Sequence, residues 1–448
     1  MNEAHLRVYN NRSELIFSDG TVQSFPEGGM NLATKARYKQ IGIELASGYL
    51  EGKILICRDR SSDLDFSRLT QEQKDILNKL VQSVTSEVGR ALVGLTILQL
   101  AVKSIQPEQN IRLHKGSSNL KDFSWCNGIS MRSLDSKYIT PVLRKYELLR
   151  LNADGFMMTR TLAENYPYSF VYKAKIKGAM AEWVSLIEAI EKNEILVEIA
   201  LCYILSQLLN QAASFKLLAS QVVRKIELLF TMEIVDLKYA SNFILTHINE
   251  SDYAARLMEI SMHSLMQAIY DCNGLTNSQL KPLSQMRSAN KKHGNIGDIE
   301  LLEDRQIVES WDAKYGKSYL RDEIEELADK LEIHPSIRLA GFVTSVEPER
   351  ISELKIRCEE IEIIYGISLE ILTFDQWVKV QFDRVLAEGI VTEQELSMAW
   401  ITAYTESLAQ RRREIAPIDE PCYQWLLTID TMLSEANNLS ILQRVLPR

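Results

Sequence analysis

The strongest constraint on the fold is a repeated switch between helical and strand periodicity in residues 251–373. Apolar residues recur at helical spacing over 253–271, 319–331 and 350–365, and runs typical of strands occupy 297–302, 306–314, 337–344 and 367–373. The expected order is α-β-β-α-β-α-β, a mixed sheet flanked by helices. Acidic residues begin the helix over 319–331 and Lys330 lies in its last turn, as the helix dipole favours.

The remaining sequence predicts mainly helices. Residues 1–65 hold short alternating runs, such as 14–17 and 52–57, and predict a small β-rich or irregular cap. One long amphipathic helix is expected over 70–104, and the proline-free stretch 168–280 predicts a helical bundle. The fold class is therefore mixed and predominantly α, with an α/β core. The expected domains are an N-terminal cap and long helix (1–105), a winged-helix-like segment (106–175), a bundle (176–250), the α/β core (251–388) and C-terminal helices (389–448).

Two basic stretches stand out in a chain whose net charge is −9. Residues 111–178 hold 12 Lys or Arg and 5 Asp or Glu, and residues 281–297 hold four basic residues and no acidic one. Within the first stretch a helix is expected over 133–146, followed by a strand, a tight turn at 152–155 and a second strand, which is the order of a winged helix. This order favours DNA contact; the alternative is a small α/β element whose basic residues are merely solvated.

Several functional classes find no support in the sequence. The six cysteines and six histidines form no zinc-binding pattern, so we expect reduced, mostly structural thiols. The chain has no Walker A loop, no G-x-G-x-x-G and no G-x-S-x-G. The most apolar stretch, 195–215, is interrupted by polar residues and predicts a buried helix. The N-terminus resembles no secretion signal, so a cytoplasmic location is expected.

Candidate chemistry lies on the first two strands of the α/β core. Period-two geometry places Asp312 and Lys314 on one face of their strand with Ser310, and places Ile307, Glu309, Trp311 and Ala313 on the other. Asp298 and Glu300 share a face of the preceding strand. If the two strands pair as a hairpin, Asp298 approaches Asp312, and two adjacent carboxylates repel unless a cation lies between them. Mg²⁺ suits such oxygen ligands. The alternative is a surface ion pair on a hairpin.

The sequence Gly297-Asp298-Ile299-Glu300, followed by Asp312-Ala313-Lys314, resembles the PD-(D/E)XK nuclease superfamily, and its surroundings resemble type II restriction endonucleases in particular. An acid-x-Lys tripeptide alone is common, so the preceding Gly-Asp and the following elements carry the resemblance, which covers about residues 250–388. Gly297 stands where the family name has Pro. The resemblance implies that Asp298 and Asp312 hold Mg²⁺, that Lys314 orients or activates the attacking water, and that Glu259 is a further metal ligand unless it is simply solvated.

The expected function is Mg²⁺-dependent, site-specific hydrolysis of double-stranded DNA by a homodimer, with a cognate DNA methyltransferase as functional partner and no membrane association. Two alternatives remain: a repair or recombination nuclease on the same core, and a non-catalytic winged-helix regulator. The candidate DNA-binding residues are Arg132, Lys137, Arg144, Lys145, Arg160, Arg287, Lys291 and Lys292.

Overall fold

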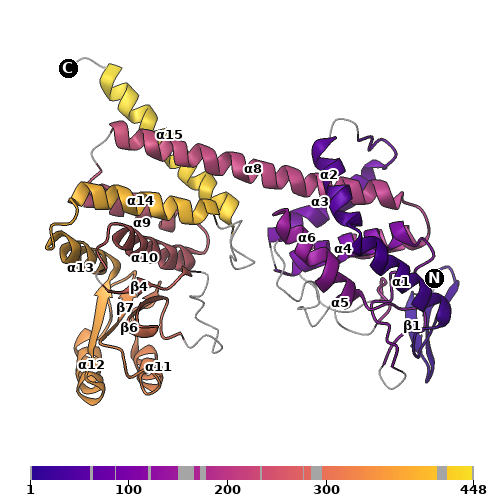
Figure 1. The fold of residues 1–448 in the computed structure, drawn as a ribbon, viewed down its shortest axis with the longest axis horizontal. Helices are drawn as coiled ribbons and strands as arrows, with labels where there is room; N and C mark the ends of the chain where they lie inside the picture. The colour runs from indigo at the N-terminus through magenta and orange to yellow at the C-terminus, as the bar shows by residue number, and fades with distance from the viewer. Residues whose placement is uncertain are drawn as a thin grey trace. The chain divides into compact units, whose positions relative to one another are not determined.

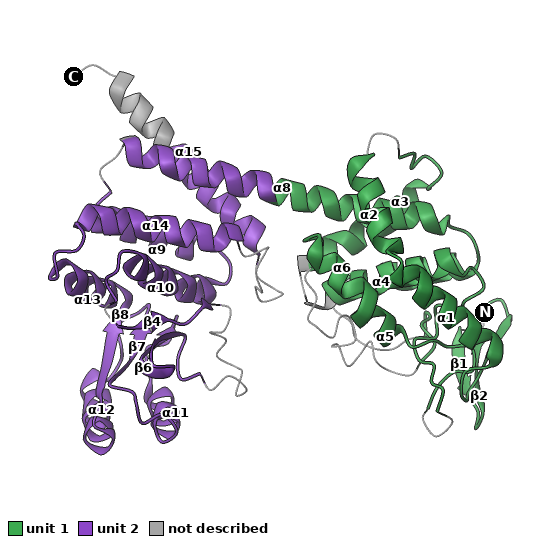
Figure 2. Cartoon of the chain, in the orientation of Figure 1, with its two compact units in different colours: residues 1–215, 417–420 green, residues 216–416, 421–448 purple. Residues whose placement is uncertain are grey.

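The computed structural model describes residues 3–60, 64–85, 87–119, 123–149, 166–171, 178–232, 235–275, 277–283, 295–410 and 421–445. It is a mixed α/β protein in which helices predominate (Figure 1). The chain divides into two compact units, unit 1 with residues 1–215 and 417–420 and unit 2 with residues 216–416 and 421–448 (Figure 2). The boundary falls inside helix α8 (Val197–Met232). Among the described residues, no helix combines the length and apolar character needed to cross a bilayer.

Unit 1 begins with an antiparallel sheet in the order β1-β2-β3, made of β1 (His5–Val8), β2 (Arg12–Ile16) and β3 (Val22–Pro26). The described helical segments that follow are α1 (Leu32–Ala46), α2 (Tyr49–Asp59), α3 (Gln71–Gln82), η2 (Ser83–Thr85), α4 (Glu87–Ile105), α5 (Met131–Leu134), η3 (Asp135–Ile139), α6 (Thr140–Lys145), α7 (Met180–Glu191) and the first part of α8.

Two sequence-based expectations for unit 1 are wrong. Residues 52–57 belong to helix α2, because Leu50, Ile54 and Cys57 are buried at helical spacing and outweigh the short alternation between them. The long helix over 70–104 is instead two helices, α3 and α4, separated by the 3₁₀ turn η2. The start of α4 lies so close to the end of α3 that a Cβ at Gly89 would be 1.7 Å from the carbonyl oxygen of Ser83.

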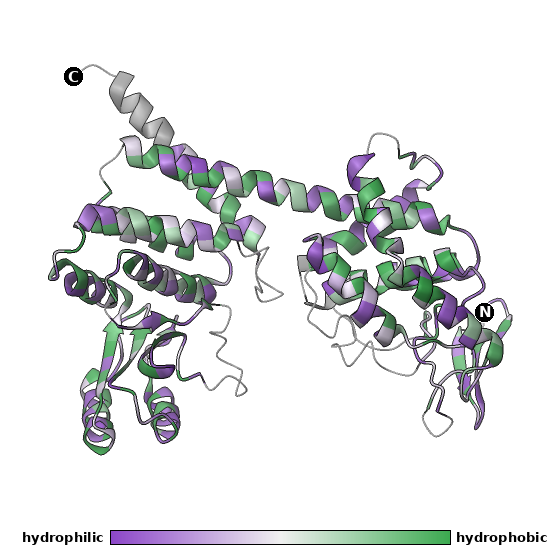
Figure 3. Cartoon of the chain, viewed as in Figure 1, coloured by the Kyte–Doolittle hydropathy of each residue, from purple (hydrophilic) through white to green (hydrophobic). Residues whose placement is uncertain are grey.

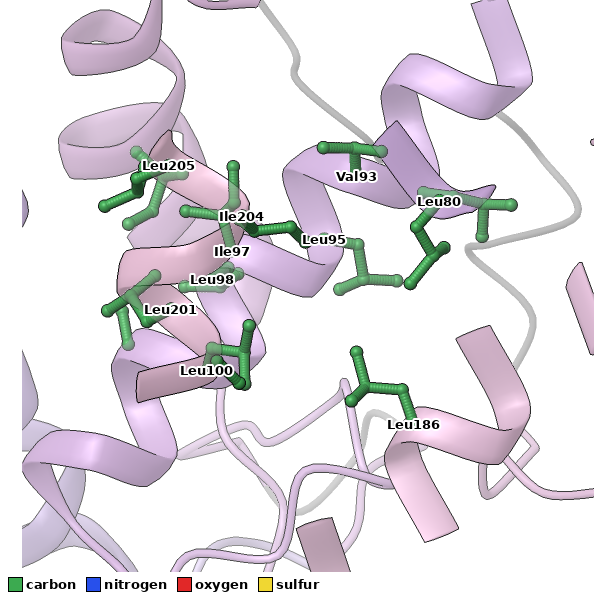
Figure 4. Close-up of a cluster of buried hydrophobic side chains, with 14 of the residues drawn as sticks. Leu80, Val93, Leu95, Ile97, Leu98, Leu100, Leu186, Leu201, Ile204 and Leu205 are labelled. Carbon is green, nitrogen blue, oxygen red and sulfur yellow. The ribbon is translucent and has the colours of Figure 1, made fainter. Parts of the chain in front are cut away.

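The core of unit 1 surrounds α4. Residues on every side of this helix, from Leu92 to Val102, are buried, as expected for a helix enclosed by others. Leucine, isoleucine and valine side chains from α3, α4, α7 and α8 point toward one another in Figure 4. Each such side chain contributes about 1.5–3 kcal/mol on full burial. The predicted buried helix over 195–215 is found as the first half of α8.

The predicted winged-helix segment is described only in part. The helix expected over 133–146 is found as three consecutive segments, α5, the π-helical turn η3 and α6, which together cover residues 131–145. Asp135, in the π-helical turn, is buried and accepts hydrogen bonds from Thr140 Oγ1 at 3.1 and 3.2 Å. The expected strand pair reaches into residues 150–165, which lie outside the described residues.

Unit 2 contains the predicted mixed sheet in the order β4-β5-β6-β7-β8, in which β4, β5 and β6 pair antiparallel and β6, β7 and β8 pair parallel. The strands are β4 (Gln279–Leu280), β5 (Ile299–Glu303), β6 (Gln306–Lys314), β7 (Leu339–Thr344) and β8 (Ser368–Thr373). Its further described helices are α9 (Leu237–Asn249), α10 (Ala254–Asp271), α11 (Arg321–Leu331), α12 (Ile351–Tyr365), α13 (Phe374–Leu386), α14 (Glu393–Gln410) and α15 (Cys422–Val445). The predicted α-β-β-α-β-α-β order is confirmed, with β4 as an addition at the sheet edge.

Helices cover both faces of this sheet (Figure 1). Helices α11 and α12 pack on the face that carries Ala340 and Phe342, and the amphipathic pattern of α11 is visible in Figure 3. On the opposite face Trp311 of β6 meets Trp377 of α13, with ring centroids 6.1 Å apart, and α10 packs against the same sheet. Strands β5 and β6 therefore lie between two layers of helices.

Candidate active site

The hairpin of β5 and β6 brings Asp298 opposite Asp312. Ile299 pairs with Trp311 in the antiparallel register, and the backbone N–H of Asp298 donates to the Trp311 carbonyl oxygen at 2.9 Å. Asp298 therefore extends the ladder by one residue beyond β5. Because facing residues of an antiparallel pair project to the same side, the two carboxylates lie on one face of the hairpin.

A glycine is required immediately before Asp298. A Cβ at Gly297 would lie 2.7 Å from both the Ser310 hydroxyl oxygen and the Trp311 carbonyl oxygen. Any side chain here, the proline ring included, would push the hairpin apart. The requirement for glycine is steric, because the backbone before Asp298 runs directly against β6.

Asp298 is a buried carboxyl group, 3% exposed. Its Oδ2 accepts a hydrogen bond from the backbone N–H of Ala313 at 3.1 Å, while Oδ1 is buried and has no hydrogen-bond partner among the described residues. Burial raises the pKa of Asp298 well above its usual range, and the nearby charges of Glu259 and Asp312 raise it further. Burial and the neighbouring acids therefore favour the neutral, protonated form of Asp298.

Lys314 supplies the positive charge of the site. Its Nζ lies 2.8 Å from Asp312 Oδ2, and both side chains are about one-fifth exposed, at 20% and 18%. Burial alone would lower the pKa of Lys314, but the charge and hydrogen bond of Asp312 and the charge of Asp298 raise it above its usual value. Lys314 is therefore an ammonium group at neutral pH, available to hold an anion or to orient water, and not a general base.

Glu259 lies on α10, within electrostatic reach of Asp298. Its carboxylate forms an ion pair with Arg256, one turn earlier on the same helix. The predicted third acid is thus at the site but is neutralised by an arginine. Arg256 brings a second cation to the same region.

Glu300, which the sequence places on the face of Asp298, has a different role. It is fully buried and bonds to Lys281 Nζ at 2.5 Å and to the backbone N–H of Ile296 at 2.6 Å. Lys281 also donates to Asn295 Oδ1 at 2.6 Å. This arrangement fixes the turn that leads into Asp298. Sequence reasoning missed Lys281, because 19 residues separate it from Glu300 and no local pattern links the two.

The other face of β6 is structural. The Glu309 carboxylate accepts hydrogen bonds from Trp311 Nε1 at 2.8 Å and from Arg384 Nη1 at 3.0 Å, and the Arg384 guanidinium compensates its charge. Strict alternation places Ile307 on this face too, and that expectation is wrong. The register shifts between Leu301 and Leu302, leaving one extra residue in β6, so Ile307 joins the core cluster of Phe342.

The donor set partly suits a hard divalent cation. Asp298 and Asp312 offer adjacent carboxylates, and the unpartnered Asp298 Oδ1 is the kind of oxygen that such a cation would bind. In the described part of the chain, however, no three His, Cys, Asp or Glu side chains are arranged to hold a metal ion. Glu259 and Asp312 are instead paired with Arg256 and Lys314. The residues would fit Mg²⁺ as a site of two carboxylates, Asp298 and Asp312, once Asp312 gives up its contact with Lys314. Glu259 could join them only by giving up Arg256.

The candidate DNA-binding residues fall into three groups. Arg132, Lys137 and Arg144 are exposed in the helical stretch 131–145 of unit 1. Lys145 is also exposed but pairs with Glu51 at 2.6 Å. Arg160, Arg287, Lys291 and Lys292 lie outside the described residues.

Unit 1 also contains a cavity of about 450 Å³, whose lining includes Trp125, Phe123, Tyr166 and Glu27. Among the described residues that line it, none is basic. Compared with models of known protein families and with curated proteins, the sequence matches none. A functional assignment therefore depends on the geometry of the β5–β6 hairpin.

Proposed function

We propose that this protein is a Mg²⁺-dependent endonuclease that hydrolyses phosphodiester bonds in double-stranded DNA at a specific short sequence, as type II restriction endonucleases of the PD-(D/E)XK superfamily do. One observation carries the proposal. A buried carboxyl group with an unpartnered oxygen, Asp298, faces Asp312, which is paired with Lys314, on adjoining strands of a mixed sheet. The five-stranded sheet with helices on both faces is compatible with that superfamily.

In this proposal Asp298 and Asp312 would hold the cation, and Glu259 would join them when Arg256 turns to a DNA phosphate. Bound Mg²⁺ would neutralise charge on the phosphate and lower the pKa of a water ligand. Lys314, kept protonated by its acidic neighbours, would donate hydrogen bonds to the attacking water and to a phosphate oxygen. The 2.8 Å contact with Asp312 Oδ2 holds the Lys314 ammonium group beside a carboxylate that would bind the cation.

The exposed basic residues of the helical stretch 131–145 support a role in holding DNA. Arginine and lysine contacts to phosphates position a protein on the duplex, whereas contacts to base edges specify sequence. The proposal extends to a homodimer, because two equivalent sites would meet the two strands of a palindrome, and to a methyltransferase that protects the host sequence. The proposed location is the cytoplasm.

The decisive test of this function is incubation of the purified full chain with plasmid and phage DNA in the presence of Mg²⁺. Discrete fragments are expected, which EDTA abolishes. Cleavage whose position depends on branched or damaged DNA structure, and not on the base sequence, would favour a repair or recombination nuclease. A gel shift of intact DNA, with no cleavage by Mg²⁺ or Mn²⁺, would reject the nuclease in favour of a non-catalytic DNA-binding regulator.

A further inference from the structure

A second cluster of reactive side chains lies in unit 1, between α2 and α8. Cys57 on α2 is buried, with 2% exposure, and its Sγ donates to the backbone carbonyl oxygen of Cys202 on α8 at 3.5 Å. Each thiol also shifts the pKa of the other: Cys57 lowers that of Cys202, and Cys202 raises that of Cys57. Cys202 is only partly buried, so of the two residues it is the one less shielded from solvent.

Charged groups surround this thiol pair from both helices. Lys53, one turn before Cys57 on α2, lies 3.5 Å from Glu198 Oε2, and Glu198 is one turn before Cys202 on α8. The Lys53 ammonium also lies 5.4 Å from the centre of the Tyr49 ring. The Tyr49 hydroxyl, in turn, lies 2.6 Å from Ser104 Oγ on α4.

These neighbours make the two thiols unequal. The hydrogen bond from Cys57 and the charge of Lys53 lower the pKa of Cys202 to about 7, although burial and the charge of Glu198 oppose the shift. The same hydrogen bond and burial raise the pKa of Cys57. Cys202 is therefore the thiol that ionises more readily, and the thiolate is the nucleophilic form.

We propose that Cys202 and Cys57 form a modification site for hydrogen peroxide, with Cys202 as the attacking thiol and Cys57 as the resolving one. The Cys202 thiolate attacks one peroxide oxygen, the O–O bond breaks, and the products are a Cys202 sulfenic acid and hydroxide, which takes up a proton to become water. The Cys57 thiol then attacks the sulfenic sulfur and releases water as the disulfide forms. Peroxide accepts two electrons and the two thiols donate them.

The disulfide would tie α2 to α8 across a sequence separation of 145 residues. A cross-link over so long a loop restricts the unfolded chain strongly, so the oxidised protein should be more resistant to unfolding than the reduced protein. The pair lies apart in sequence from the β5–β6 hairpin, and its chemistry does not depend on nuclease activity.

The test uses the reduced full chain treated with one equivalent of hydrogen peroxide, then alkylated and digested without reductant for mass spectrometry. The expected product is a peptide pair joining Cys57 to Cys202. In Cys57→Ser, oxidation should stop at a Cys202 sulfenic acid that dimedone captures. Cys358→Ser is the control, because burial raises the pKa of this thiol to about 11, and it should leave the cross-link unchanged.

Alkylation rates at pH 7 test the role of the charges. Lys53→Met should slow alkylation of Cys202, because the Lys53 charge helps to lower the pKa of this thiol. The change should be smaller than the roughly tenfold loss expected for a thiol at its ordinary pKa of about 8.5, because Cys57 has the larger effect and remains in place. Glu198→Gln should accelerate it, because Glu198 opposes ionisation. Opposite effects of two neighbouring substitutions are not expected from a loss of folding. Oxidation spread evenly over all cysteines, or equal rates in both variants and the wild type, would overturn the proposal.

Discussion

The ion pair between Lys281 and Glu300 gives a prediction whose size follows from its burial. The Glu300 side chain is 0% exposed and the Lys281 side chain 11%, and their charged atoms are 2.5 Å apart. Removing one partner of a buried pair leaves the other charge uncompensated and costs about 3–5 kcal/mol. Glu300 keeps its bond to the Ile296 N–H, so we expect the lower end, about 3 kcal/mol, for Lys281→Met.

A double-mutant cycle separates the pair from its surroundings. Glu300→Gln should cost about 2 kcal/mol, because the amide still accepts from the backbone N–H groups while Lys281 loses its counter-charge. The double variant should be destabilised by clearly less than the sum, with an interaction energy of about 1–3 kcal/mol. Urea unfolding followed by circular dichroism provides the free energies.

The control is the exposed pair of Lys79 and Glu182, whose side chains are 64% and 23% exposed. Lys79→Met should change the free energy of unfolding by less than about 1 kcal/mol. If Lys281→Met costs no more than this control, or if the two substitutions at the buried pair are additive, the turn before Asp298 is not held by this ion pair and our account of it is refuted.

Three further predictions concern single positions. Gly297→Ala should destabilise the protein by about 1–3 kcal/mol through overpacking against Trp311. The control Gly42→Ala, in an open part of α1, should stabilise it by up to about 1 kcal/mol. An unchanged free energy of unfolding in Gly297→Ala would contradict the steric argument. Asp298→Asn should raise the thermal melting temperature of the metal-free protein, because it removes a buried acid beside two others, and an unchanged or lower melting temperature would count against that reasoning. His247 accepts from the Tyr404 hydroxyl and donates to the Trp425 carbonyl, and burial lowers its pKa to about 4. As pH falls, the imidazole of His247 is protonated in the unfolded chain before it is protonated in the folded one. The free energy of unfolding should therefore decrease by about 3 kcal/mol between about pH 6.5 and about pH 4. Urea titrations should show the unfolding free energies of the wild type and His247→Gln converging over that range.

Much of unit 2 could be predicted because its local signals agree. The bounds predicted for β6 are those observed, and α10, α12 and β8 start within one residue of expectation. Each has several apolar residues at one period between clear polar boundaries, so propensity and packing favour the same structure. The pairing of β5 with β6 then brings Asp298 and Asp312 together.

What the sequence could not predict depends on contacts between distant residues. The break between α3 and α4 leaves the apolar spacing intact, so periodicity cannot detect it. Ile307 points to the other face of the sheet because of a β-bulge, and this bulge is defined only by the pairing of β6 with β5. Neither the Lys281–Glu300 pair nor the contact of Cys57 with Cys202 has a local pattern, because each joins residues that tertiary packing alone brings together.

The central claim is that Asp298, Asp312 and Lys314 form one hydrolytic site. The most direct test compares the rate of Mg²⁺-dependent DNA cleavage for the wild type, Asp312→Asn and Lys314→Ala, with the exposed Asp329→Asn as control and with DNA binding measured in Ca²⁺. We predict that both site variants lose cleavage by at least about a hundredfold while binding persists and the control matches the wild type. Wild-type cleavage rates in Asp312→Asn would contradict the claim.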